Sequence, residues 1–121
     1  MMILCPHFLI DIMKNLVIIG AGGMGRTIFD VARESIGYGI EYTIKGFIDD
    51  NLSALDGFED YPPMLGTISH YLPEVDDVFT FSIGGESRRV CIEYLMERNA
   101  KFINIVHSTA RIGSNVRMGE G

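Results

Sequence analysis

Apolar residues occur along the chain first as a continuous run and then at helical spacing. Residues 16–19 (LVII) form an aliphatic run that ends in glycine, which is typical of a strand buried on both faces of a parallel sheet. A helix is expected after the glycines, from the apolar positions Ile28, Val31, Ala32 and Ile36. Gly37 and Gly39 are expected to end this helix.

Later segments continue the alternation of strands and helices. Further strands are expected at residues 42–48, 64–66, 78–83 and 102–106. Residues 52–63 predict a loop, residues 68–72 a weak helix ended by Pro73, and residues 86–99 a longer helix. The buried face of the longer helix is expected to hold Val90, Cys91, Tyr94 and Leu95. This alternation implies an α/β, Rossmann-like domain whose parallel sheet has the order 3-2-1-4-5.

The last sixteen residues change to a period of six. An aliphatic residue opens each six-residue unit, at Val106, Ile112 and Met118. In a parallel β-helix each such unit forms one flat side, and the aliphatic positions stack inward. Residues 106–121 therefore predict the first, incomplete coil of a left-handed β-helix of hexapeptide repeats. Because each coil buries its interior only against its neighbours, we expect this chain to be the N-terminal piece of a longer protein.

Residues 1–12 are expected to be an extension or an artefact of an upstream start, ahead of a domain that spans residues 13–105. The segment is apolar, but it has neither the basic start nor the small-residue cleavage site of a signal peptide. It is also too short to cross a bilayer. No other stretch predicts a membrane span, so a cytoplasmic protein without a membrane partner is expected.

The charge and the cysteines narrow the classes of partner. A formal net charge of −6 argues against a nucleic-acid partner, because neutralising a phosphate backbone needs a basic face. It does not argue against a small phosphate ligand, which backbone N–H groups can bind. Cys5 and Cys91 lack metal-ligand spacing and predict thiols in a reducing cytosol, so no metal is expected.

Residues 20–25 (GAGGMG) fit the pattern G-x-G-x-x-G, directly after a predicted buried strand and at the start of a helix. The glycines permit a tight turn and a close approach of the backbone to a ligand. The start of the helix offers unpaired N–H groups and a positive dipole end to a diphosphate. This loop predicts a nucleotide site, with a glycine-rich turn that binds nothing as the alternative.

Two acidic residues end the neighbouring strand. Asp49 and Asp50 follow residues 42–48, at the rim where α/β sheets bind ligands, and a carboxylate there can accept hydrogen bonds from ribose hydroxyls. Asp49 lies 29 residues after Gly20, a longer spacing than the roughly 20 residues of dinucleotide folds. An Asp-Asp-Asn sequence is also ordinary turn chemistry, so a ligand role and a turn role both stay open.

Gly84 and Gly85 follow the strand expected beside the central one, with Ser82 before them. Two glycines again suggest close backbone approach to a ligand across from the first glycine loop. Arg88 and Arg89 come next, and one of them is a candidate phosphate contact, with solvated helix charges as the alternative. No histidine belongs to a Ser/His/Asp or Cys/His constellation, so no catalytic residue is predicted in this chain.

The stretch of residues 14–121 resembles one known family, and five segments carry the resemblance. The segments are LVIIGAGGMGR, GFIDDN, PMLGTI, FSIGGESRR and KFINIVHSTARIGSNVRMGEG. In this order they resemble bacterial sugar O- and N-acetyltransferases of the sialic acid O-acetyltransferase (NeuD) and PglD type. The resemblance implies that the Rossmann-like domain binds the acceptor, a nucleotide-sugar that is often UDP-linked. It also implies that the β-helix forms a homotrimer and holds acetyl-CoA between subunits.

The resemblance assigns roles to particular residues. Those that would line the diphosphate are Gly20, Gly22, Gly23 and Met24. Asp49 and Asp50 would lie near the nucleoside, and Gly84 and Gly85 would close the opposite wall. A bulky residue in place of Gly22 is expected to block the diphosphate and to strain the backbone. The family's general base, a β-helix histidine, would follow Gly121, so this chain alone is expected to bind and not to catalyse.

Two other functions stay open. An NAD-binding domain of a dehydrogenase would share the glycine loop, but its catalytic domain would not be built from hexapeptides. A stand-alone nucleotide-sensing module would need no further domain. The sequence leaves open which sugar and which nucleotide bind, whether the acetyl group goes to nitrogen or oxygen, and the oligomeric state.

Overall fold

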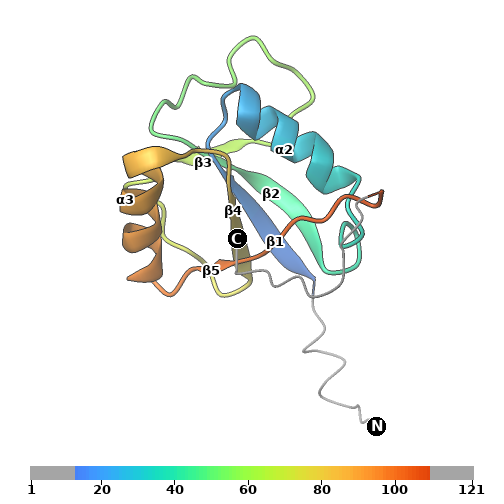
Figure 1. The fold of residues 1–121 in the computed structure, drawn as a ribbon. Helices are drawn as coiled ribbons and strands as arrows, with labels where there is room; N and C mark the ends of the chain where they lie inside the picture. The colour runs from blue at the N-terminus through green and yellow to red at the C-terminus, as the bar shows by residue number, and fades with distance from the viewer. Residues whose placement is uncertain (1–12, 110–121) are drawn as a thin grey trace, which may run out of the picture.

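The computed structural model describes residues 13–109 of the chain (Figure 1). They form a five-stranded sheet of order β3-β2-β1-β4-β5 in which all neighbouring strands are parallel. The strands are β1 (Lys14–Ile19), β2 (Tyr42–Ile48), β3 (Met64–Gly66), β4 (Asp77–Phe81) and β5 (Lys101–Phe102). The helices are α2 (Gly23–Arg33) and α3 (Gly85–Met96). The predicted α/β, Rossmann-like class and the strand order are confirmed.

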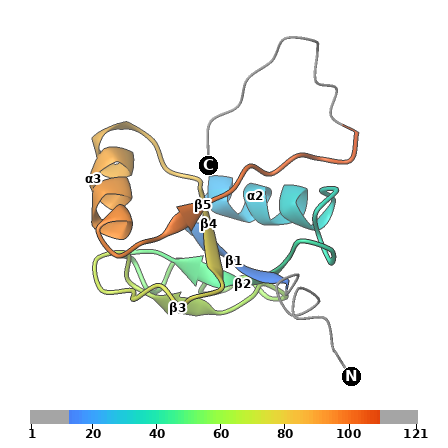
Figure 2. The ribbon, with the colours of Figure 1, turned by 90° about the horizontal axis from the view of Figure 1, so that it is seen from below.

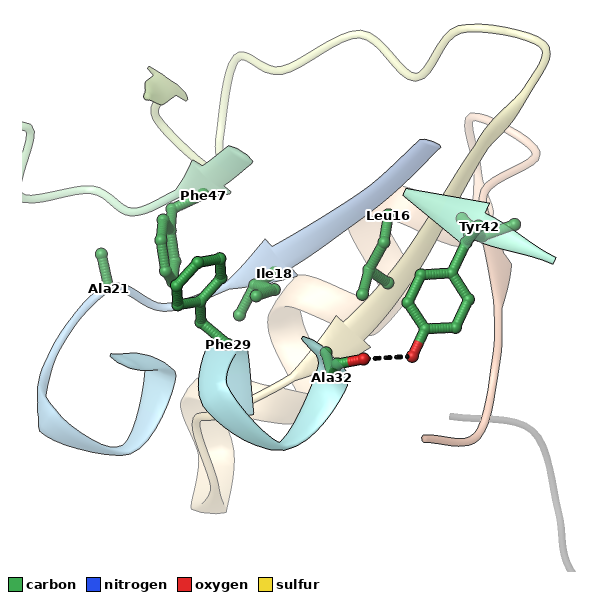
Figure 3. Packing of buried hydrophobic residues seen from close by; sticks show 8 residues of the cluster. Leu16, Ile18, Ala21, Phe29, Ala32, Tyr42 and Phe47 are labelled. Atoms are coloured by element: carbon green, nitrogen blue, oxygen red, sulfur yellow. Dashed lines mark hydrogen bonds between the residues drawn. The ribbon is translucent and has the colours of Figure 1, made fainter. Parts of the chain in front are cut away.

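The central strand β1 is buried on both faces, as its aliphatic run predicts. Leu16 and Ile18 pack with Phe29 of α2 on one face (Figure 3). Val17 and Ile19 belong to a second core on the other face, together with Leu95 of α3. Figures 1 and 2 show the two helices on opposite sides of the sheet. Alternation along one strand therefore builds two cores, and each helix covers one of them.

Helix α2 ends at Arg33, before the glycines that were expected to end it. The Ser35 and Tyr42 hydroxyls each donate to the Ala32 carbonyl oxygen at 2.9 Å, and Figure 3 shows the Tyr42 bond. A carbonyl of the last helical turn is thereby satisfied by side chains, so the helix can end there. Ile36, expected on the buried face, is instead 60% exposed.

The prediction of a weak helix at residues 68–72 is wrong. Residues 68–70 form a turn, and the Asp50 carboxylate accepts a hydrogen bond from the Ile68 N–H at 3.0 Å. The Tyr71 N–H bonds back to the Thr67 carbonyl oxygen at 3.0 Å. A carboxylate from the end of β2 thus organises a single turn, a long-range contact that helical spacing does not report.

The last strand is also shorter than expected, because β5 ends at Phe102 instead of residue 106. The Ile103 N–H still donates to a carbonyl of β4, but the Ile36 N–H then bonds to the Val106 carbonyl oxygen at 3.1 Å. The chain leaves the sheet because its backbone pairs with the segment after α2. Strands β2 and β3 have the expected bounds, and the other strand and helix ends differ from expectation by at most three residues, which is ordinary boundary variation.

Helix α3 buries a narrower face than expected. Leu95 is fully buried and Cys91 and Tyr94 are half-buried, whereas Val90 is 61% exposed. The expected extension, residues 1–12, and most of the expected coil, residues 110–121, lie outside the described residues. Between residues 13 and 109, no helix is both long and apolar enough to cross a membrane.

A β-bulge in β2 aims a lysine at the α3 side of the sheet. Leu16 of β1 pairs with Ile44 and Val17 pairs with Gly46, so Lys45 is the extra residue of the bulge. Its Nζ lies 3.0 Å from Oδ1 and 3.2 Å from Oδ2 of Asp77, the first residue of β4. The bulge therefore lets a β2 side chain reach β4, across the strand that separates them.

Tyr71 and Glu74 complete this polar cluster. Lys45 Nζ lies 2.8 Å from the Tyr71 hydroxyl oxygen and pairs with the Glu74 carboxylate. The Tyr71 hydroxyl and the Glu74 N–H both donate to Asp77, at 2.6 and 2.9 Å. Burial alone would lower the pKa of Lys45, but its hydrogen bonds to Glu74, Tyr71 and Asp77 raise it overall. The buried Asp77 carboxylate is thus fully partnered.

Alkaline pH is expected to weaken the fold through Tyr71. Burial, with the Asp77 carboxylate adding to it, raises the pKa of Tyr71 from 10.0 to about 12. The unfolded chain releases this proton near pH 10 and the folded chain keeps it until about pH 12, so the free energy of unfolding falls across that interval. Urea titrations should show a smaller fall for Tyr71→Phe, with Tyr61→Phe as the control outside the cluster. Equal falls in all three proteins would contradict this assignment.

Candidate functional site

Two of the loop glycines are required by the fold. Gly20 follows β1 with φ +101°, a left-handed conformation that favours glycine, and a Cβ there would lie 2.9 Å from Cγ2 of Ile83. At Gly25 a Cβ would lie 2.7 Å from the Gly20 carbonyl carbon, and closer still to its oxygen. These glycines let α2 start directly against the end of β1.

The other two glycines of this loop are not explained by packing. Gly22 has φ −74°, which any residue adopts, and a Cβ there would meet nothing within 4 Å. At Gly23 the nearest atom to a Cβ would be Nη2 of Arg26, 3.9 Å away. Gly22 is also the N-cap of α2 and makes no side-chain cap hydrogen bond. The start of α2 therefore presents bare backbone to solvent, where first-turn N–H groups have no partner within the helix.

Asp49 fixes the glycine loop to the end of β2. Its Oδ2 accepts a hydrogen bond from the Ala21 N–H at 2.8 Å, and its Oδ1 accepts one from the Asn51 N–H at 2.8 Å. The Gly20 N–H also donates to the Ile48 carbonyl oxygen at 2.8 Å. Asp49 thus stabilises the glycine loop, a role that its distance from Gly20 in the sequence does not reveal.

Asp50 points to the α3 side of the same edge. It lines a cavity of about 110 Å³ with Ile68, Ser69, Val90, Cys91 and Tyr94. This volume is well below the roughly 300–1,000 Å³ of sites that enclose a small-molecule ligand. Burial, with the Asp50 charge adding to it, raises the pKa of the Cys91 thiol. The cavity could take part of a ligand that extends along the rim, but not a whole nucleotide.

A second glycine pair stands beside the first loop. Gly84 is the N-cap of α3 and Gly85, with φ +67°, is its first residue; a Cβ at either would meet nothing within 4 Å. The Ser82 hydroxyl donates to the carbonyl oxygens of Ile19 and Gly20 at 2.8 and 3.1 Å. Because β1 and β4 are adjacent and parallel, both glycine loops lie at one edge, where the strand order switches.

Three further residues that the sequence singled out, Met24, Arg88 and Arg89, lie in the two helices that start at this edge. Met24, in the first turn of α2, is 61% exposed. The Arg88 guanidinium lies over the Phe81 ring, with Cζ 5.0 Å from the ring centre, and Arg89 forms an exposed ion pair with Glu86 at 3.0 Å. Sequence reasoning missed Arg26, the residue directly after the glycine pattern.

His107 lies at the far end of α2 from the glycine loop. Its Nε2 is 2.7 Å from Oε1 of Glu34, the C-cap residue of α2, and its Nδ1 is 2.7 Å from the Thr109 hydroxyl oxygen. An eleven-residue helix is about 16 Å long, so His107 holds the segment after β5 in place and does not face the loop. Between residues 13 and 109, no group of His, Cys, Asp and Glu could hold a metal ion.

A larger cavity, of about 370 Å³, lies at the opposite edge of the sheet. Its lining residues are Pro73, Glu74, Val75, Asp77, Arg98, Asn99 and Lys101. Open α/β sheets bind their ligands outside the carboxyl ends of the strands, and this cavity adjoins the amino ends of β4 and β5. The carboxyl edge is therefore the better candidate site.

A parallel α/β sheet with glycine loops on both sides of the strand-order switch defines a Rossmann-like domain. Residues 15–95 match the family model of the PglD N-terminal domain, and the chain belongs to this family. It is also 29% identical over 114 residues to UDP-N-acetylbacillosamine N-acetyltransferase of Bacillus subtilis (strain 168). That match covers 90% of this chain and 50% of the relative, so the chain spans about half of the relative's length. The family resemblance seen in the sequence is confirmed.

Proposed function

We propose that this chain is the acceptor-binding domain of an acetyl-CoA-dependent sugar acetyltransferase. The acceptor that it binds is a nucleotide-linked sugar, and a UDP-sugar in particular. The observation that carries the proposal is Gly22. It is a glycine that neither backbone angle nor packing requires, at the uncapped start of a helix. A diphosphate seated on that bare backbone accounts for it, because a side chain would occupy the ligand's place. The Bacillus subtilis relative, named as a UDP-N-acetylbacillosamine N-acetyltransferase, supports both the UDP-sugar and the acetyl transfer.

The proposed site extends along the carboxyl edge of the sheet. The diphosphate contacts Gly20, Gly22, Gly23 and Met24, and Gly84 and Gly85 form the opposite wall. Asp50 lies towards the nucleoside, next to the 110 Å³ cavity. Asp49 acts mainly by holding the loop, since both of its oxygens already accept backbone hydrogen bonds.

The proposed acetyl transfer is assigned to a second domain. We propose residues 13–105 as the acceptor domain and residues 106–121 as the start of a left-handed β-helix, in a cytoplasmic protein. Acetyl-CoA and the trimer contacts would belong to that β-helix, so no residue between 13 and 109 is assigned to either. The acceptor domain, residues 13–105, would then bind the acceptor without acetylating it by itself.

Calorimetric titration of the chain with UDP-, CMP- and GDP-sugars and with NAD tests the proposal. A UDP-sugar should bind most tightly, with an affinity that falls as salt rises, because a charged diphosphate is recognised. Tighter binding of NAD than of every sugar nucleotide would favour the dehydrogenase alternative. No binding of any of them would leave a Rossmann-like scaffold without a nucleotide.

Replacing Gly22 tests the diphosphate position itself. Gly22→Val should weaken UDP-sugar binding about tenfold to a hundredfold, by removing at least one charge-assisted hydrogen bond of about 1.5–3 kcal/mol. The strain expected from the sequence is wrong, because φ is −74°, so the variant should fold. Asp50→Ala should weaken UDP-sugar binding less than Gly22→Val does, since the exposed Asp50 carboxylate stays partly solvated.

Gly22→Asp sharpens the test because it should separate folding from binding. Aspartate is a good N-cap residue and suits the positive end of the helix, so thermal stability should be kept or raised. The same carboxylate would repel a diphosphate and abolish binding. Full affinity in Gly22→Asp would overturn the proposed diphosphate position.

A further inference from the structure

Arg26 is held beside the glycine loop by two contacts from different parts of the chain. Its Nη1 donates to the Ala21 carbonyl oxygen at 3.1 Å. Its guanidinium stacks over the ring of Phe58, with Cζ 3.8 Å from the ring centre. Phe58 comes from the loop between β2 and β3, which Figure 1 shows arching over the start of α2. The planar group is therefore fixed in direction before any ligand arrives.

Among the described residues, no acidic side chain pairs with the positive charge of Arg26. By contrast, Arg33 in the last turn of the same helix pairs with Asp30 at 3.1 Å. A cation in the first turns of a helix opposes the positive end of the helix dipole. An anion bound at this end would pair with the Arg26 charge and would also offset the repulsion between Arg26 and the helix dipole.

The position of the guanidinium fits such an anion. Nη2 lies 3.9 Å from the place of a Cβ on Gly23, so it borders the open space over Gly22 and Gly23. Arginine binds phosphate oxygens through a planar pair of N–H donors, and such charge-assisted bonds are the strong ones. The backbone of Gly22 and Gly23 and the side chain of Arg26 can therefore contact one phosphate group.

The loop that carries Phe58 is itself anchored in the core. Phe58 packs edge-on against Tyr61, with ring centres 6.4 Å apart. Tyr61 packs against Phe29 at 5.4 Å and Phe47 at 6.3 Å, and both of these side chains are buried. A series of aromatic contacts thus connects the core on the α2 side of the sheet to the Phe58 ring beneath Arg26.

We propose that Arg26 is the cation that binds the diphosphate of the nucleotide, and that Phe58 is a positioning residue for it. The inference rests on the proposed function and adds a binding side chain that neither the glycine pattern nor the strand ends contain. It also makes the loop of residues 52–63 one wall of the site, next to the glycine loop.

Titration of the full 121-residue chain with UDP tests the role of Arg26. Arg26→Gln should weaken binding about tenfold or more and should flatten the dependence of affinity on salt, because a charge–charge contact is lost. Arg33→Gln is the matched control: it removes the same charge and a similar stack, over Phe29 at 4.5 Å, at the far end of the helix. It should leave both the affinity and the salt dependence unchanged.

Phe58 variants test positioning separately from charge. Phe58→Leu keeps Arg26 but removes the ring beneath it, and should weaken UDP binding severalfold, whereas Phe58→Tyr should restore it. UDP binding by the unmutated chain with equal affinity in Arg26→Gln would overturn this inference and leave the proposed function standing. No UDP binding by the unmutated chain would overturn both. Equal losses in the Arg26→Gln and Arg33→Gln variants would assign Arg26 to helix stability instead.

Discussion

Replacing Gly25 with alanine is expected to destabilise the domain by about 3 kcal/mol, the upper end of the range for overpacking a core. The added methyl carbon would lie 2.7 Å from the Gly20 carbonyl carbon. That obstacle is backbone, so it cannot swing away as a side chain can. Gly20 is itself fixed by φ +101° and by a hydrogen bond from its N–H to Ile48. Helix α2 would have to move off β1, and the core beneath it would open.

Gly23→Ala is the matched control, two residues away in the same loop. Its methyl group would meet only the tip of Arg26, at 3.9 Å, and alanine favours a helix over glycine by up to about 1 kcal/mol. Urea denaturation should therefore show loss of stability for Gly25→Ala and no loss, or a small gain, for Gly23→Ala. Equal stability of the two variants would show that α2 is not packed against Gly20 as described.

The strands were predictable because their apolar runs fit one environment. A run such as residues 16–19 has no polar side for solvent, so it belongs in the middle of a parallel sheet. The observed sheet places it there, between β2 and β4. Strand order follows from right-handed crossovers once the alternation of strands and helices is known. The fold is thus encoded locally and can be read from the sequence.

The ends of elements were less predictable, because contacts between distant residues decide them. Tyr42 caps the Ala32 carbonyl of α2 from ten residues further along the chain, and Asp50 caps the turn at Ile68 from eighteen residues before it. Neither contact leaves a periodic signal in the sequence. Glycine, which commonly marks a helix end, is therefore a poor guide here, and α2 stops before Gly37.

The candidate site shows the same division. The glycine pattern located the loop, but it could not tell the glycines that the fold needs, Gly20 and Gly25, from those left open, Gly22 and Gly23. That distinction depends on which atoms face each Cα. The stack of Arg26 on a ring in the β2–β3 loop joins two segments that are far apart in sequence. Only the folded chain brings them together.

Replacing Lys45 with methionine is expected to lower the free energy of unfolding by about 3 kcal/mol. This is the lower end of the range for removing one partner of a buried ion pair. The Asp77 side chain is 0% exposed and would lose its cation, while the Tyr71 hydroxyl and the Glu74 N–H would remain as donors. The lower end applies because Lys45 itself is 23% exposed. Lys14→Met is the matched control: its partner Asp76 adjoins Asp77 in sequence, but that pair is exposed and 3.5 Å long.

An exposed pair of this kind contributes about 0–1 kcal/mol, so Lys14→Met should hardly change the urea midpoint. The cost of Lys45→Met arises from a stranded charge and not from lost packing, so neutralising that charge should recover part of it. The double variant Lys45→Met/Asp77→Asn keeps an acceptor for Tyr71 and Glu74 and should be more stable than Lys45→Met alone. A double-mutant cycle measures this coupling. Strictly additive losses would mean that the bulge in β2 serves packing, and that the pairing of Lys45 with Asp77 contributes no net stability.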